Sequence, residues 1–211
     1  AQWLEDLGVF ERPVLAAHSI HLDEKDLDIY QRRGVRVTYN PVSNMKLASG
    51  IMPYRKMRDR GIPISLGTDG AQSNNSMDLL RDLREGVLLQ KVVAQDARVL
   101  SAREAVRMVT IEGAKALRME QELGSLECGK RADLIVLDPK SPRLTPLHRW
   151  DLEHLYGAVT YAACGPDVRD VMVDGKWLMR ERRVLSFDEE EVLKEGQRAS
   201  AYLVEHAGLH R

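Results

Sequence analysis

Residues 14–39 read VLAAHSIHLDEKDLDIYQRRGVRVTY, in which two short apolar runs flank a polar stretch with helical spacing. Apolar runs of four or five residues are typical of buried strands. Asp23, followed by Asp26 three residues later, predicts a capping box for a helix over about 24–33, and Gly34 predicts its end. The stretch therefore predicts a strand, a helix and a second strand.

The pattern continues toward the C-terminus. After an irregular loop that follows Asn40, Pro53 predicts the start of a helix, Gly61 predicts its end, and residues 62–67 form a third strand. A long helix then presents one broad apolar face made of Met77, Leu80, Leu83, Leu88 and Leu89. Ser101 and Glu104 predict a capping box for a further helix that runs to about Leu117.

Three strand–helix units in succession predict an α/β fold with a parallel sheet. A closed eight-stranded (β/α)8 barrel needs roughly 250 residues. This chain has 211 residues and supplies about three barrel strands. The residues alone leave two possibilities, a small open sheet or part of a barrel whose other strands lie elsewhere.

The last third of the chain has a different pattern. Residues 132–138 predict a strand, and Asp174-Gly175 predicts a hairpin between strands at 168–173 and 176–179. Val184-Leu185 is typical of a short edge strand, and a charged amphipathic helix follows from about Asp188 to His206. We therefore expect three regions: 1–123 as the βα part, 124–187 as a small β part, and 188–211 as a C-terminal helix.

Composition excludes several classes of protein. The 31 basic and 32 acidic residues give a formal net charge of −1, so no electrostatic feature predicts nucleic-acid binding. The apolar stretches are too short to span a bilayer, and the first residues do not resemble a signal peptide. Cys128 and Cys164 lie far apart, which favours a reduced, cytoplasmic protein. Ala1 begins a mid-helix pattern, so we expect the chain to be part of a larger protein.

Two polar residues follow predicted strands directly, namely His18 and Asp69. Sites in parallel βα folds gather at the carboxyl ends of strands, so both side chains should face one cavity at the same end of neighbouring strands. An imidazole and a carboxylate there could bind a metal or move a proton. Spacing alone leaves open that Asp69 only caps a helix and that His18 is a structural histidine.

Three ordered motifs and the tail carry a family resemblance. They are LAAHSIHL at 15–22, NPVSNMKLASG at 40–50 and LGTDGAQSNN at 66–75, followed by GKRADLIVL at 129–137 and VMVDGKW at 171–177. Together they resemble the amidohydrolase superfamily, in the branch of the methylthioadenosine/S-adenosylhomocysteine deaminases and triazine chlorohydrolases. The resemblance implies the C-terminal portion of a (β/α)8 barrel, followed by a small β-sandwich.

The resemblance also implies a mechanism. Members of this branch hold one divalent metal, often zinc or iron, which activates water to attack an electron-poor ring carbon such as C6 of adenine. Asp69 matches the aspartate that ligates the metal and takes the proton from the attacking water. His18 matches the histidine that orients this water. A metal lowers the pKa of bound water toward 7, and a nearby carboxylate can carry the proton.

The chain also departs from the family pattern. No HxH pair precedes His18, and the further histidine ligand and its companion glutamate are missing. The other histidines lie in the tail and are expected to be surface or packing residues: His148, His154, His206 and His210. One ligand and one orienting histidine cannot hold a catalytic metal tightly, so we expect this chain to be inactive without an N-terminal half.

Other motif residues suggest supporting roles. Ser73 is a candidate substrate contact, although a helix-capping role explains it equally well. Asn44 and Ser43 could order the loop over the site, and turn chemistry explains them too. His21 is expected to lie behind the site or in its loop.

The favoured function is the metal-dependent deamination of an adenine-type thioether nucleoside. A related chlorohydrolase or guanine-type deaminase is the alternative within the superfamily. From a different class, the chain could be a non-catalytic fragment that only packs or oligomerises, because an incomplete barrel leaves open sheet edges that favour association. Beyond the substrate, the expected partners are the missing N-terminal half and further copies of the protein in a homo-oligomer.

Overall fold

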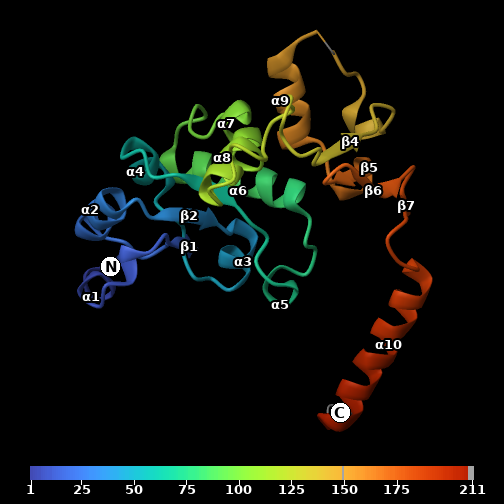
Figure 1. Cartoon of the computed structure of the whole chain (residues 1–211), viewed down its shortest axis with the longest axis horizontal. Helices are drawn as coiled ribbons and strands as arrows, with labels where there is room; N and C mark the ends of the chain where they lie inside the picture. Colours follow the sequence, from blue (N-terminus) through green and yellow to red (C-terminus); the bar gives the residue numbers. More distant parts are fainter. Residues whose placement is uncertain (149, 209–211) are drawn as a thin grey trace. The chain divides into compact units, whose positions relative to one another are not determined.

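The computed structural model describes residues 1–148 and 150–208 and divides them into two compact units (Figure 1). Unit 1 comprises residues 1–131 and 139–167, and unit 2 comprises residues 132–138 and 168–211, of which 209–211 lie outside the described residues. Unit 1 contains a parallel sheet and unit 2 an antiparallel one. The chain is therefore a mixed α/β protein, as the sequence predicts.

The sheet of unit 1 consists of β1 (Leu15–Ala17), β2 (Arg36–Tyr39) and β3 (Ile64–Leu66), in the order β1-β2-β3. All pairings are parallel, with Ala16 opposite Val37 and Val37 opposite Ile64. Parallel strands need crossover connections, which α2 (Glu24–Arg33) and α4 (Tyr54–Asp59) provide. The three predicted strands are confirmed.

The predicted helix signals of α2 are also confirmed. The Asp23 carboxylate accepts from the Asp26 backbone N–H at 2.8 Å, and Asp26 accepts in return from the Asp23 backbone N–H at 3.2 Å. The helix ends at Gly34, whose φ of 63° lies in the left-handed region. Two short helical elements precede β1, namely α1 (Gln2–Asp6) and η1 (Val9–Glu11).

Two sequence expectations for the connecting segments were wrong. The loop after Asn40 contains α3 (Pro41–Lys46), because proline at the first helical position has no N–H that a helix would need. The helix expected from Ala102 to Leu117 is divided into α7 (Ala102–Met108) and α8 (Ile111–Ala116). Thr110 causes this break locally, since its hydroxyl donates to the Val106 carbonyl at 2.8 Å and competes with the helical bond.

The long helix is α6 (Leu79–Ala94), which follows a short α5 (Ala71–Asn74). Leu80 and Leu83 are buried as predicted, but Leu88 is 39% exposed and Met77 lies before the helix at 50% exposure. Val87 and Gln90 complete the buried face instead. The predicted buried face was therefore correct for the first turns of the helix. In the later turns the residues that face the core are different from those predicted.

The core of unit 1 lies against one face of the sheet. Val37 and Tyr39 on β2 are fully buried, whereas Arg36 and Thr38 on the opposite face are only partly buried. Leu15 and Ala17 on β1 are exposed on that second face. One face of the sheet is thus packed under helices, and the described residues leave the other face uncovered at β1, whereas Ser65 of β3 on that face is buried.

Residues 139–167 cluster with unit 1, whereas the sequence placed them in the β part. They form η2 (Pro142–Leu144), α9 (Leu152–Tyr161) and η3 (Gly165–Asp167). Ser141 donates to Asp167 at 2.6 Å, and the Gly165 backbone N–H donates to Asp78 of unit 1 at 2.8 Å. The helical pattern of α9 was missed because no strong start or stop signal marks it beyond Asp151.

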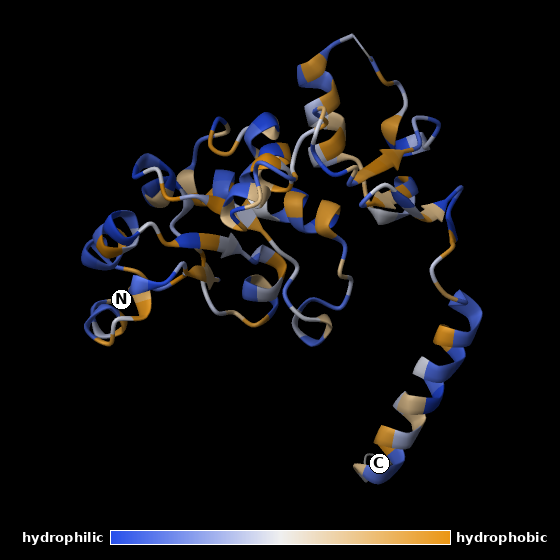
Figure 2. Ribbon diagram, in the orientation of Figure 1, coloured by the Kyte–Doolittle hydropathy of each residue, from blue (hydrophilic) through white to orange (hydrophobic). Residues whose placement is uncertain are grey.

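Unit 2 contains a four-stranded antiparallel sheet and one long helix. The strands are β4 (Leu134–Leu137), β5 (Val168–Val173), β6 (Lys176–Arg180) and β7 (Arg183–Val184), paired in that order. The predicted hairpin turn is confirmed, with φ of 50° at Asp174 and 73° at Gly175. The helix α10 (Glu189–His206) is capped by Asp188, and hydrophobic and hydrophilic bands alternate along it (Figure 2).

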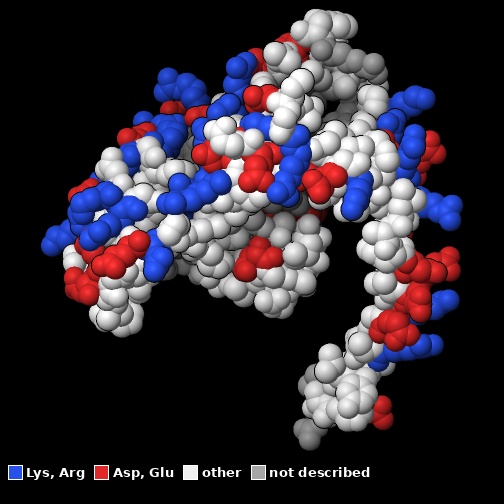
Figure 3. All heavy atoms as spheres, viewed as in Figure 1, with Lys and Arg blue, Asp and Glu red and all other residues white. Residues whose placement is uncertain are grey.

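The surface agrees with the balanced composition. Basic and acidic side chains are interspersed on the face shown in Figure 3, and neither sign forms a continuous field. Cys128 and Cys164 are both free thiols. None of the helices in the described ranges is long and apolar enough to cross a membrane. His148 and His206 are exposed, His154 is half-buried, and His210 lies outside the described residues.

Candidate active site

His18 and Asp69 lie beyond the carboxyl ends of β1 and β3. The His18 backbone N–H still donates to the Thr38 carbonyl at 3.0 Å, so His18 continues the register of β1. Asp69 follows Leu66, the last residue of β3, by three positions. The two strands flank β2 and are not direct neighbours, which corrects the sequence expectation. Both residues nevertheless lie at the same edge of one parallel sheet.

Asn40 joins all three strand ends. It follows β2, is 4% exposed, and its Oδ1 accepts from the His18 backbone N–H at 3.2 Å. Its Nδ2 donates to the Gly67 carbonyl at 3.0 Å. Gly67 must be glycine, because a Cβ there would lie 2.8 Å from the Thr38 methyl group. One amide therefore fixes the spacing between the backbones that carry His18 and Asp69.

The backbone is strained at both candidate residues. His18 has a φ of 64° and Asp69 a φ of 63°, in the left-handed region that non-glycine residues rarely adopt. Such conformations cost free energy and persist only where the surrounding contacts enforce them. They place both side chains away from the directions that an extended strand would give them.

Two consecutive residues of α3 reach the two candidate residues. Asn44 Oδ1 lies 2.8 Å from His18 Nδ1, and Ser43 Oγ donates to Asp69 Oδ2 at 2.6 Å. With Oδ1 as the acceptor, His18 Nδ1 is the donor of this hydrogen bond. Asn44 and Ser43 are nearly fully buried, so their side chains hold fixed positions behind the site.

Asp69 is held as an anion by neutral donors. Hydrogen bonds from Ser43 and then from Ser73, at 2.8 Å, lower the pKa of Asp69 below its ordinary value, with a smaller contribution from the Gly70 N–H. In the described part of the chain Asp69 forms no ion pair with Lys or Arg. The site therefore contains an ionised carboxylate whose charge is not cancelled by a protein cation.

The remaining predicted residues occupy defined positions. Ser73 is 6% exposed and donates to both Asp69 and the Gly70 carbonyl, so its hydroxyl is engaged within the loop. Neither the substrate contact nor the capping role considered for Ser73 anticipated the bond to Asp69. His21 Nε2 bonds to the Ser49 carbonyl at 2.9 Å and thereby fixes the loop after α3.

The described residues do not form a complete metal site. No group of three or more His, Cys, Asp and Glu side chains that could hold an ion occurs within residues 1–148 and 150–208. A catalytic zinc site uses three protein ligands as a rule. The ionised Asp69 fits one ligand position, and the chemistry of the remaining donors in this chain does not complete the set.

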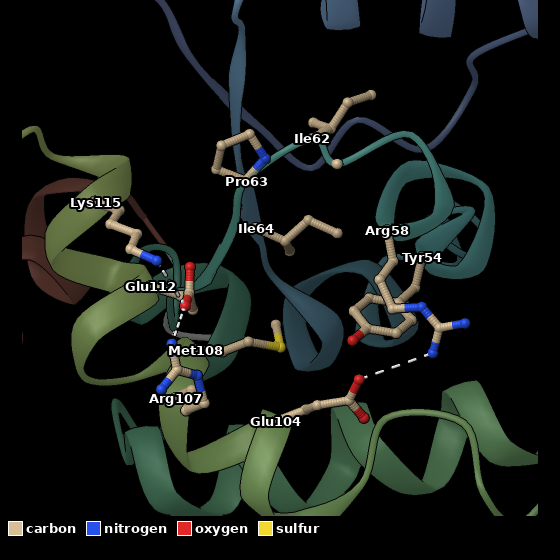
Figure 4. A pocket seen from close by; sticks show the side chains of 11 residues that line it. Tyr54, Arg58, Ile62, Pro63, Ile64, Glu104, Arg107, Met108, Glu112 and Lys115 are labelled. Carbon is tan, nitrogen blue, oxygen red and sulfur yellow. Dashed lines mark hydrogen bonds and ion pairs between the residues drawn. The ribbon is translucent and has the colours of Figure 1, made fainter.

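A pocket of about 390 Å³ lies at the other end of β3 (Figure 4). It is lined by Ile62, Pro63 and Ile64 at the start of the strand, and by charged residues of α4, α7 and α8. Its charged side chains face one another. Arg58 forms an ion pair with Glu104, and Glu112 accepts hydrogen bonds from both Arg107 and Lys115. The pocket is separate from the edge of the sheet that carries His18 and Asp69.

Sequence reasoning missed Asn40 as a site residue and treated it only as the end of a strand. The same rule that selected His18 and Asp69 could have found it, because Asn40 is the polar residue that directly follows the middle strand. The contacts of Ser43 and Ser73 with Asp69 depend on the fold of α3 and α5, and no local pattern announced them.

Comparison with known proteins agrees with this geometry. The Amidohydrolase family model matches residues 1–178. A 5-methylthioadenosine/S-adenosylhomocysteine deaminase of Desulforudis audaxviator is 46% identical over 202 residues, which are 96% of this chain and 46% of that protein. A 5'-deoxyadenosine deaminase of Methanosarcina acetivorans is 47% identical over 205 residues, 97% of this chain and 46% of that protein.

Among solved structures, an adenosine deaminase from Xanthomonas campestris with bound zinc superimposes with a TM-score of 0.89 at 33% identity, covering 96% of this chain and 45% of that one. The chain thus spans less than half the length of each of these proteins. The family model that matches residues 1–178 and the superimposed fold lead to one conclusion: this chain belongs to the amidohydrolase family.

Proposed function

We propose that this chain is the C-terminal half of a metal-dependent enzyme that hydrolytically deaminates an adenine-type nucleoside, with 5'-methylthioadenosine or S-adenosylhomocysteine as substrate. One observation carries the proposal: at the edge of the sheet that also presents His18, two serine hydroxyls orient the Asp69 carboxylate and lower its pKa. The deaminase names of relatives at about 45% identity support the substrate class.

The fold proposal follows from the uncovered sheet face. The three strands of unit 1 are strands six to eight of a (β/α)8 barrel, and an N-terminal half supplies the other strands and covers Leu15, Ala17 and Thr38. The four-stranded sheet of unit 2 is one part of a small β-sandwich, which strands from the N-terminal half complete. The lengths of the relatives support this division.

In the assembled enzyme Asp69 is one ligand of a divalent metal, zinc or iron, and the N-terminal half brings the remaining ligands. The metal, when bound, supplies the positive charge that lowers the pKa of water toward 7. Zinc in the Xanthomonas campestris structure supports this assignment. Two further residues support the site without touching the metal. His21 holds the loop through its bond to the Ser49 carbonyl, and Asn44 orients His18.

The chain's own residues handle the proton. Asp69 takes a proton from the attacking water, the water oxygen bonds to C6 of the adenine ring, and the proton passes to the amino nitrogen that leaves as ammonia. His18 receives a hydrogen bond from the attacking water at Nε2, because Asn44 holds the proton on Nδ1. Protonation of the ring nitrogen needs an acid from outside this chain.

Ser73 acts on the substrate through Asp69, since both of its hydrogen bonds lie within the loop. The residues that choose between nucleosides lie largely in the N-terminal half.

The further partners that we propose are that half and additional copies of the protein in a homo-oligomer. A nucleoside substrate is consistent with a cytoplasmic enzyme.

The test is to co-express this chain with the N-terminal half of the Desulforudis audaxviator deaminase, or to express the full-length protein, and to measure ammonia release. We expect metal-dependent release from 5'-methylthioadenosine that a chelator abolishes and added zinc restores, and no release from the chain alone. Activity on a chlorotriazine only would instead assign the chlorohydrolase function, and a metal-loaded assembly with no activity would support a non-catalytic role.

A further inference from the structure

A buried carboxylate lies behind the Asp69 loop and has no role in the chemistry above. Asp82, in the first turn of α6, is 0% exposed and forms no ion pair in the described ranges. Burial raises the pKa of Asp82 to about 6, and the charges of Asp78 and Glu85 also raise it while that of Arg81 lowers it. Because a buried carboxylate without a cation is costly, stability alone does not explain it.

The partner of Asp82 is Asn74, the last residue of α5, which is 6% exposed. Asn74 Nδ2 donates to both carboxylate oxygens of Asp82, at 2.9 and 3.1 Å, and to the Thr68 carbonyl at 2.8 Å. Asn74 Oδ1 accepts from the hydroxyl of Ser76 at 2.9 Å. The side-chain amide of Asn74 thus bridges α6 and the residue directly before Asp69.

A carboxylate suits this position because it can only accept hydrogen bonds. It therefore fixes the Asn74 amide with its NH₂ toward Asp82, which leaves the second amide hydrogen for the Thr68 carbonyl. A neutral amide at position 82 could pair with either end of Asn74. In one of these two pairings the Asn74 oxygen would face position 82, and the Thr68 carbonyl would lose its donor.

The contact with Thr68 bears on the conformation of Asp69. The Thr68 carbonyl belongs to the peptide unit that precedes the Asp69 Cα, so fixing that unit restricts rotation about the Asp69 N–Cα bond. Asp69 has a φ of 63°, which costs about 1 kcal/mol or more for a non-glycine residue. We propose that Asp82 and Asn74 are positioning residues that hold the Thr68–Asp69 peptide and thereby aim the Asp69 carboxylate.

Amide hydrogen exchange of this chain, by mass spectrometry, tests the proposal without metal or substrate. In D82N we expect residues 68–76, whose Ser73 and Asn74 amides donate to the Gly70 carbonyl, to exchange about tenfold faster. Unchanged exchange over 68–76 in D82N would overturn the proposal.

Gln90 offers a matched control. It is also buried on α6, at 3% exposure, and its amide donates to the Tyr39 hydroxyl and the Met52 carbonyl, away from the Asp69 loop. In Q90M we expect faster exchange around Met52, whose carbonyl loses its donor, and no change over 68–76. Equal loss of protection over 68–76 in Q90M and D82N would show a general weakening of α6. It would contradict a specific positioning role for Asp82 and Asn74.

A double variant distinguishes the effect of the Asn74–Thr68 hydrogen bond from a change in overall stability. N74D/D82N restores a donor and an acceptor between positions 74 and 82, yet it leaves the Thr68 carbonyl without the Asn74 donor. We expect it to regain melting temperature relative to D82N while residues 68–76 still exchange fast. Recovery of both quantities would show that the bond to Thr68 does not matter, and it would overturn the proposal even if D82N fails to fold.

The kinetic readout rests on the proposed deaminase function and uses the assembled enzyme. D82N should lower kcat about tenfold with KM changed less than about threefold, while Q90M keeps the kcat of the parent enzyme. Equal kcat values for D82N and Q90M would contradict the proposal. If the parent assembly releases no ammonia, the proposed function fails. The exchange experiment still tests whether Asp82 and Asn74 position the Thr68–Asp69 peptide.

Discussion

The two ends of β3 handle charge in opposite ways. At its start, each acid that lines the pocket is matched by a cation, with Glu112 3.1 Å from Lys115 and Glu104 3.8 Å from Arg58 (Figure 4). Beyond its end, Asp69 receives hydrogen bonds from two serine hydroxyls and from no Lys or Arg of the described residues. An ion pair cancels charge, whereas neutral donors stabilise an anion and leave its net charge in place.

This difference supports the proposal that a cation binds at the Asp69 end. The paired charges at the start of β3 satisfy one another and need nothing further. The ionised Asp69 attracts a cation that the described chain does not contain, and its lowered pKa keeps it ready as a ligand. Three predictions test the contrast between the two ends.

The largest effect is expected for Asp69→Asn. The amide keeps the size of the side chain but removes the charge, the metal ligand and the proton acceptor. In the assembled enzyme kcat for ammonia release should fall by about 10³-fold or more. The matched variant at the other end, Glu112→Gln, should keep kcat within about twofold. Similar losses in the two variants would remove the distinction between the ends.

A smaller effect is expected for Asn40→Ala, which leaves the strand ends without their shared amide. Loss of the bonds to the His18 N–H and the Gly67 carbonyl should lower the free energy of unfolding by about 2–3 kcal/mol. Urea denaturation of the chain measures this quantity. A loss below about 0.5 kcal/mol would mean that Asn40 does not hold the site edge together.

The smallest effect is expected for Lys115→Met at the pocket. The Lys115 side chain is 44% exposed, and Glu112 keeps its bond from Arg107 at 2.6 Å. The free energy of unfolding should therefore change by no more than about 0.5 kcal/mol in the same urea experiment. A loss as large as that of Asn40→Ala would show that the ion pairs stabilise their end as strongly as the amide stabilises the other.

Much of the fold could be predicted from sequence because its signals are local. The Asp23 capping box, the Gly34 stop and the Asp174-Gly175 turn each act within a few residues, and all three were confirmed. The break at Thr110 and the helix within 152–161 were missed, since the first depends on one hydroxyl contact and the second lies in a stretch without clear signals.

The positions of His18 and Asp69 could be predicted from the sequence, whereas the side chains that contact them could not. His18 and Asp69 follow strands directly, so the topology of parallel sheets assigns them to one edge. Their left-handed backbone, and the contacts from Asn44 to His18 and from Ser43 to Asp69, arise only when α3 packs beside the strand ends. The sequence also suggested adjacent strands, whereas β2 separates them.

The charge state of Asp69 is the central claim, and carboxyl-carbon NMR of this chain across a pH titration measures it directly. Because the folded pKa is lowered, the bonds to Asp69 stabilise the fold above the ordinary value of 3.8 and lose that contribution as pH falls through the folded value. We predict a midpoint below 3.8 for Asp69, which rises toward 3.8 in Ser43→Ala. A midpoint at or above 3.8 in the parent chain, unchanged by Ser43→Ala, would contradict the account.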